Sequence, residues 1–130
     1  MEENKSTDIL TELKQQLEKL DIPVYYGAGD KSAFKYSEFI VFGRSNIRIV
    51  QHKTAYTKNF EIVIVAENWV RENLIQDVIK MAGNAGVRVS NGAEIVIDYQ
   101  TKNDLSYEIV SIPFFVAEKG KQMNRLSYKH

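Results

Sequence analysis

Cysteine is absent from this chain of 130 residues, and histidine and proline are scarce, with two of each. Without cysteine the protein can form neither a disulfide framework nor a metal site built on thiolates. His52 and His130 are the only histidines, and a metal site needs several ligands that converge. The sequence contains no Gly-x-Ser-x-Gly motif and no other recognisable catalytic set. We therefore expect a protein that is not an enzyme and that has no cofactor and no metal site.

An excess of one charge is also missing, because 17 Lys and Arg residues balance 17 Asp and Glu residues. A chain without net charge has no general attraction to nucleic acids or anionic membranes. Tyrosines on the predicted strands could stack on bases, but the aromatic and glycine signature of an RNA-recognition strand is absent. These tyrosines are Tyr25, Tyr26, Tyr56, Tyr99 and Tyr107. We expect no membrane and no specific nucleic acid among the partners.

Long apolar runs are lacking too. No stretch approaches the roughly 20 apolar residues that span a bilayer. The polar segment Met1–Lys5 does not begin a signal peptide, so we expect a cytoplasmic protein. Hydrophobic residues still make up 44% of the chain, which is enough for one domain with its own core.

The first predicted element is an amphipathic helix over Asp8–Leu20. Ser6 or Thr7 can cap its N-terminus, and Pro23 ends it. Its leucines fall at helical spacing on one face, at Leu10, Leu13, Leu17 and Leu20. We expect this stripe to pack on the protein's own sheet. The alternative is a partner helix or coiled coil, which usually needs at least about three heptads.

The glycine-rich segment Gly27–Ser32 has a superficial likeness to a phosphate-binding loop, because glycines let backbone amides approach an anion. A Walker loop has Gly, Lys and Ser or Thr in succession. Here Asp30 separates Gly29 from Lys31 and adds a negative charge. We expect a surface loop, with nucleotide binding as the less favoured alternative.

Three apolar segments in the middle of the chain predict strands. Phe39–Phe42 is continuously apolar, and Ile47–Val50 alternates; Gly43–Asn46 between them reads as a turn or a bulge. Asn59–Ala66 is the strongest strand signal, and its density of β-branched residues favours a central position in the sheet.

A second helix is predicted after Asn68, which is a good N-cap, and Gly83 is expected to end it in the left-handed conformation. Its apolar stripe is wide, over Val70, Leu74, Ile75, Val78, Ile79, Met81 and Ala82. Trp69, the only tryptophan, lies at the start of this helix. It either caps the core or anchors an interface, where tryptophan is over-represented.

The second half of the chain predicts more strands, at Val87–Val89, Glu94–Gln100 and Ser106–Val116. Asn91–Gly92 and Lys102–Asp104 are turns. Pro113 cannot donate to a ladder, so its strand should lie at an edge or carry a bulge there. The strand carboxylates are expected to face solvent, at Glu61, Glu94, Asp98 and Glu108.

Together these elements predict an α+β fold, with a mainly antiparallel sheet of about five or six strands and both helices packed on one face. Residues 1–117 form a single α+β domain. Residues 118–130 are rich in basic side chains and form an arm that orders on a partner or frays. The candidate interface residues are Trp69, Lys31, Phe34, Tyr36, Lys119, Lys121, Arg125 and Tyr128.

In its order of elements the chain resembles the tail terminator, or tail-completion (head–tail joining), proteins of long-tailed bacteriophages. The resemblance spans about Asp8–Lys119 and consists of apolar patterns and element lengths. The matching pieces are the helix Asp8–Leu20, the segments Ile22–Tyr26, Phe39–Gly43 and Asn59–Val65, the helix Leu74–Met81 and the hairpin Ile95–Val116.

The resemblance implies a virion component of the tail–neck region that is not an enzyme and that occupies the host cytoplasm before assembly. Such proteins form a hexameric ring that stops tail-tube growth and presents a surface to the head-completion or neck protein. The partners would be other copies of the chain, the major tail-tube protein and that neck protein. Gly27–Ser37 and the C-terminal arm would be the segments that order on assembly. The alternative is a small protein-binding or regulatory domain of phage or prophage origin.

Overall fold

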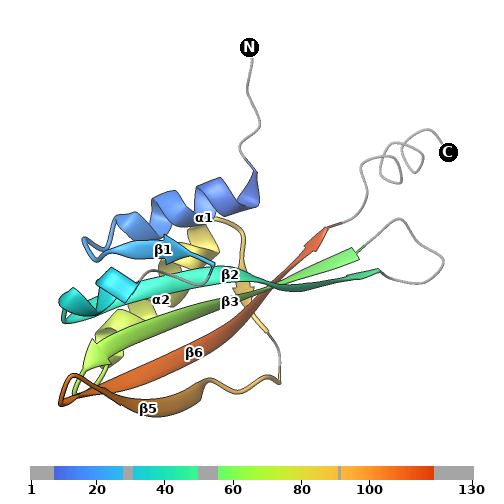
Figure 1. Ribbon diagram of the computed structural model, residues 1–130. Coiled ribbons are helices and arrows are strands. Elements are labelled where there is room, and N and C mark those ends of the chain that lie inside the picture. Colours follow the sequence, from blue (N-terminus) through green and yellow to red (C-terminus); the bar gives the residue numbers. More distant parts are fainter. Residues whose placement is uncertain (1–7, 28–30, 50–55, 91, 119–130) are drawn as a thin grey trace, which may run out of the picture.

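The alternation of β-type and helical patterns produces two layers, with both α-helices on one face of a six-stranded, mostly antiparallel sheet (Figure 1). A computed structural model describes residues 8–27, 31–49, 56–90 and 92–118. The predicted α+β class and the placement of the helices are therefore confirmed. The elements are α1 (Ile9–Glu18), β1 (Val24–Tyr26), the 3-10 helix η1 (Lys31–Lys35), β2 (Glu38–Ile49), β3 (Tyr56–Glu67), α2 (Glu72–Asn84), β4 (Arg88–Val89), β5 (Val96–Lys102) and β6 (Leu105–Glu118).

Strand β3 lies at the centre of the sheet, as its β-branched sequence predicts. It pairs with β2 on one side and β6 on the other, in the order β1-β2-β3-β6. The pair β1–β2 is parallel and the other pairs are antiparallel. Both β4 and β5 pair with the far side of β6, β4 near its C-terminal end and β5 near its N-terminal end.

The main core lies between the helices and the sheet. Leu13 and Leu17 of α1 are fully buried, and Leu10 and Leu20 pack against the same cluster. The leucine stripe therefore packs on the protein's own sheet, as we expected. The other large buried residues of this core are Ile40, Phe42, Phe60, Ile62, Ile64, Leu74, Val78, Val87, Val110, Ile112 and Phe114.

A second, smaller cluster covers part of the opposite face and is centred on η1. Ala33 of η1 is buried against Phe39, Val65 and Tyr107. The ring of Phe34 meets Phe39 and Tyr107 edge-on, with centroids 5.2 and 5.1 Å apart. The predicted surface loop Gly27–Ser32 overlaps η1 only at Lys31 and Ser32, and residues 28–30 lie outside the described residues. The apolar residues that follow it, Ala33 and Phe34, form the short helix because they complete the second cluster.

The caps of both helices differ from the prediction. Asp8 is the N-cap of α1, and its carboxylate accepts from the Thr11 N–H at 3.0 Å; Ser6 and Thr7 lie outside the described residues. The N-cap of α2 is Arg71, not Asn68. The Asn68 N–H instead donates to the Ser106 carbonyl at 2.8 Å, so the strand pairing continues one residue past β3.

The end of α2 is a Schellman motif built on Gly86. Gly86 has φ +88°, its N–H donates to the Gly83 carbonyl, and the Val87 N–H donates to the Ala82 carbonyl. Gly83, the predicted left-handed residue, lies inside the helix. Gly86 takes that role because Val87 and Ala82 are then both buried in the main core.

The sequence left open whether Gly43–Asn46 is a turn or a bulge, and it predicted an edge position or a bulge for the strand of Pro113. Gly43–Asn46 is a bulge within the continuous strand β2, since the register shifts between Arg44 and Asn46. The strand of Pro113 is an internal strand rather than an edge. The Pro113 carbonyl accepts from the Ser90 N–H at 3.0 Å on the β4 side. The missing proline N–H therefore faces the gap between β4 and β5, where it removes no bond to β3.

The burial of Leu17 predicts a large effect on stability. Leu17→Ala should lower the free energy of unfolding by about 2–5 kcal/mol, because the side chain is fully buried between α1 and the sheet. Gln15→Ala on the same helix is the matched control and should change it by less than about 0.5 kcal/mol, since Gln15 is exposed. Urea denaturation followed by circular dichroism measures both. Equal effects of the two substitutions would contradict this packing of α1.

The Asp8 cap predicts a pH dependence. The hydrogen bonds from Thr11 hold the pKa of Asp8 below its ordinary 3.8. A depressed folded-state pKa stabilises the fold at pH values above 3.8, and this contribution is lost as the pH falls through the folded value. The stability difference between wild type and Asp8→Ala should therefore be constant near neutral pH and shrink in acid. Asp8→Asn keeps a capping group and should match wild type at neutral pH.

Candidate functional site

The connection between β3 and α2 places Trp69 on the surface. Asn68 adopts a left-handed conformation, with φ 69°, and the Trp69 N–H donates to the Glu67 carbonyl at 2.8 Å. The chain therefore turns sharply where the β3–β6 ladder ends. As a result the Trp69 side chain is 68% exposed.

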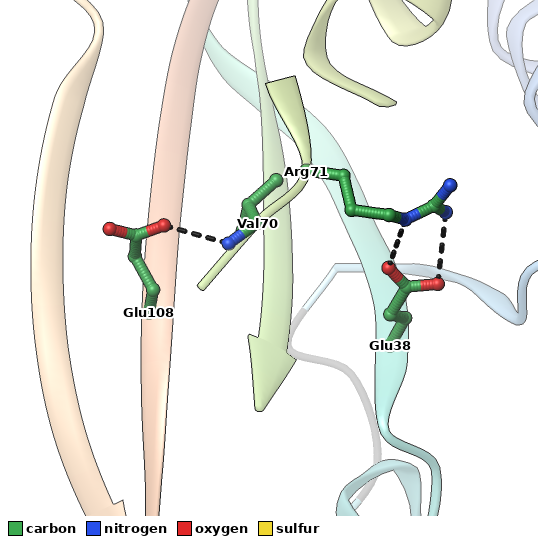
Figure 2. Close-up of polar contacts among 4 residues, drawn as sticks. All are labelled: Glu38, Val70, Arg71 and Glu108. Atoms are coloured by element: carbon green, nitrogen blue, oxygen red, sulfur yellow. Dashed lines mark hydrogen bonds and ion pairs between the residues drawn. The ribbon is translucent and has the colours of Figure 1, made fainter. Parts of the chain in front are cut away.

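The residues that follow Trp69 are fixed to the sheet (Figure 2). The Val70 N–H donates to Glu108 Oε1 of β6 at 2.7 Å, and the Val70 side chain is buried in the main core. The Arg71 guanidinium donates from Nε and Nη2 to both carboxylate oxygens of Glu38 on β2, at 2.9 and 3.1 Å. This ion pair raises the pKa of Arg71 above its ordinary value. The segment Asn68–Arg71, called the Trp69 corner below, is thus held on both sides of the tryptophan.

A tryptophan that is exposed on a fixed backbone is suited to binding. A partner that covers it removes a large apolar surface from water and orders few additional torsions. Of the two interpretations that the sequence left open for Trp69, capping of the core is wrong, because most of the side chain contacts solvent. The geometry favours the interface interpretation.

Strand β5 forms a second exposed apolar surface next to the Trp69 corner. Val96, Ile97 and Tyr99 are 55%, 52% and 66% exposed, so both faces of the strand contact solvent. Tyr99 pairs with Glu108 across the β5–β6 ladder, and the hydrogen bond and charge of Glu108 raise the pKa of Tyr99 above 10.0. Glu108 therefore contacts both surfaces, through Val70 and through Tyr99.

The hairpin turn between β5 and β6 determines which backbone groups of β5 point outward. Asn103 and Asp104 have φ 54° and 64°, as in a two-residue type I′ turn, which makes Lys102 and Leu105 a hydrogen-bonded pair. Hydrogen-bonded and non-hydrogen-bonded pairs alternate along the hairpin from there. The N–H groups of odd-numbered β5 residues therefore point away from β6. Consistent with this, the Tyr99 N–H donates to its neighbour Asp98 Oδ1 at 2.9 Å.

The predicted interface residues fall in different places. Lys31 begins η1, and Phe34 is half-buried in the second cluster, where it contributes to packing. Tyr36 is exposed. The Ser37 carbonyl next to it accepts from the Glu67 N–H at 2.9 Å, so Tyr36 lies at the same end of the sheet as the Trp69 corner. The arm residues Lys119, Lys121, Arg125 and Tyr128 lie outside the described residues, as do His52 and His130.

The prediction for the strand carboxylates holds at three of four positions. Glu61, Glu94 and Asp98 are exposed, whereas Glu108 is half-buried and accepts from Val70. The apolar residues of β5 were not predicted as surface residues. The turns before and after β5 were the only sequence signal that it forms an edge hairpin.

An open groove of about 370 Å³ lies at the opposite edge of the sheet, between α1 and the end of the parallel β1–β2 pair. Its lining residues are Leu10, Thr11, Lys14, Gln15, Glu18, Tyr26 and Phe42. The Tyr26 ring meets Phe42 edge-on, with the centroids 5.2 Å apart, and is itself exposed. This surface, called the α1 groove below, is concave and largely apolar, whereas Trp69 projects.

The described part of the chain contains no group of three or more side chains suited to holding a metal ion. None of its helices combines the length and the apolar character that crossing a bilayer requires. No protein-family model matches the chain, and no curated protein matches its sequence.

Removal of the Glu108 carboxylate should loosen the Trp69 corner. Since Trp69 is the only tryptophan, its fluorescence anisotropy reports this segment alone. Glu108→Ala should lower the anisotropy, because the Val70 N–H loses its acceptor. Glu94→Ala removes an exposed carboxylate elsewhere and is the control. Unchanged anisotropy in Glu108→Ala would mean that the hydrogen bond does not restrain Trp69.

Proposed function

We propose that this chain is a non-enzymatic phage structural protein that caps the tail tube as a ring and joins the tail to the head. Its partners would be further copies of itself, the major tail-tube protein and a head-completion or neck protein. The resemblance of the sequence over about Asp8–Lys119 supports this proposal. The α+β arrangement of the described residues is compatible with it. The proposal places the protein in the tail–neck region of the virion.

The observation that carries the proposal is the exposure of Trp69 on a fixed backbone. An assembly protein needs anchor residues that are ready to bind without reorganisation, and tryptophan is frequent among the residues that dominate interface energies. The bonds of Val70 to Glu108 and of Arg71 to Glu38 supply this preorganisation. They stabilise the position of a side chain that contributes little to the core.

The arrangement of the surfaces is compatible with a ring. A cyclic assembly of more than two copies uses two different surfaces on each subunit. The Trp69 corner is bonded to the N-terminal part of β6, beside β5. The α1 groove lies at the β1 edge, at the other side of the sheet. A projecting aromatic residue and an apolar groove at opposite edges provide such a pair.

A small protein-binding or regulatory domain would use the same exposed tryptophan. The two functions differ in stoichiometry, because a binding domain forms a complex with one partner and does not close into a ring. Light scattering with and without the matching tail-tube protein separates them. We expect a ring of several copies when the tube protein is present. No change in mass upon addition of the tube protein would overturn the tail-terminator function.

Trp69→Ala tests the role of the corner in this assembly. We expect at least about a 30-fold loss of affinity for the ring, equivalent to about 2 kcal/mol. The free energy of unfolding should change by less than about 0.5 kcal/mol, since the side chain is mostly exposed. Gln76→Ala, at an exposed position of α2, is the control. A Trp69→Ala protein that assembles like wild type would show that the corner is not the contact.

A further inference from the structure

The outer edge of β5 is unpaired within the described residues. In these residues β5 forms a ladder with β6 alone. The backbone groups of Ile97, Tyr99 and Thr101 point away from β6, as the hairpin geometry and the bond from the Tyr99 N–H to Asp98 indicate. This edge is seven residues long and carries exposed apolar side chains. Natural edge strands are usually short, charged or interrupted, because a long apolar edge pairs with other strands.

We propose that two copies of the chain pair through β5, antiparallel and about a two-fold axis, so that their sheets become continuous. In this arrangement Tyr99 forms a hydrogen-bonded pair with Thr101 of the second copy, and Gln100 lies opposite Gln100. Asp98 then lies opposite Lys102 of the second copy, and the symmetry repeats this contact. The inference does not depend on the proposed function.

The charges of β5 select this register. Asp98 and Lys102 both point to the face of η1, since Asp98 pairs with Ile109 of the second cluster and Lys102 Nζ lies 4.5 Å from the ring of Phe34. The pairing centred on Gln100 places these opposite charges at positions where side chains approach most closely. A pairing centred on Asp98 would place two carboxylates opposite each other. A pairing centred on Tyr99 would place Asp98 opposite Gln100 and Lys102 opposite Val96.

In the unpaired chain the Asp98 carboxylate occupies the outward Tyr99 N–H. Pairing replaces this bond by one between the Tyr99 N–H and the Thr101 carbonyl of the second copy. The carboxylate is then free to approach Lys102 of the second copy, so no charged group is left without a partner. Asp98 and Lys102 lie two residues to either side of Gln100, so the two-fold axis at Gln100 places each of them opposite the other in the second copy.

This dimer differs from the ring of the proposed function. A two-fold contact uses one surface twice and closes at two copies. The charged pair lies on the η1 face of β5, whereas Trp69 lies in the connection between β3 and α2. Substitutions can therefore remove one contact and leave the other in place. The proposed dimer also covers the outer edge of β5, which would otherwise be open to aggregation with strands of other chains.

Charge reversal tests the pairing in the full chain by sedimentation equilibrium. We expect wild type to reach twice the chain mass of 14.9 kDa. Asp98→Lys and Lys102→Asp should each raise the dissociation constant by roughly tenfold or more, because two favourable cross-strand pairs become two repulsive ones. Mixing the two variants should restore a dimer with one copy of each, since every Lys then lies opposite an Asp. The double variant D98K/K102D should also dimerise.

The control for net charge is the pair Asp77→Lys and Lys80→Asp at exposed positions of α2, which should each dimerise like wild type. A monomeric wild type, or a mixture that stays monomeric, would overturn the proposal. So would an equal loss of dimer in the control pair. If β5 instead binds a strand of another protein, wild type is monomeric alone. Loss of the dimer in Asp98→Lys with ring formation on the tube protein retained would support both proposals independently.

Discussion

The pairing of β3 with strands on both sides is the constraint on which the rest of the structure depends. Every residue from Tyr56 to Glu67 has a partner on β6, and nearly all have one on β2. The alternation of side chains along β3 then assigns Ile62 and Ile64 to the helices and Val63 and Val65 to the η1 side. Both cores follow from this register, since a shift of one residue would exchange the two faces.

The end of the same ladder creates the Trp69 corner. The Asn68 N–H still bonds to β6, and the left-handed turn at Asn68 then directs the chain toward α2. Val70 enters the core and Arg71 reaches Glu38, so Trp69, which lies between this turn and Val70, is left outside. Trp69 is thus exposed because it lies in the short connection between the end of β3 beside β6 and the start of α2 over the main core.

The two edges of the sheet have opposite character. At one edge the short strand β1 and helix α1 leave a concave groove. At the other, β5 extends from β6 in a tight hairpin, and neither α-helix of the described residues covers it (Figure 1). Among the described residues, α1 and α2 leave part of the width of the sheet uncovered, and the apolar residues of β5 are accessible there. The Asp98 carboxylate satisfies one outward donor of this edge.

The sequence by itself determined the elements that depend on local periodicity and turn chemistry. The leucine stripe of α1, the β-branched strand β3 and the turn at Asn103–Asp104 were enough for the α+β class, because burial follows the helical or strand period. Tertiary structure alone decided the N-cap of α2, the role of Gly86, the internal position of Pro113 and the exposure of Trp69 and β5. Each of these depends on which strand lies alongside or which face is covered, and the local pattern of residues does not encode that.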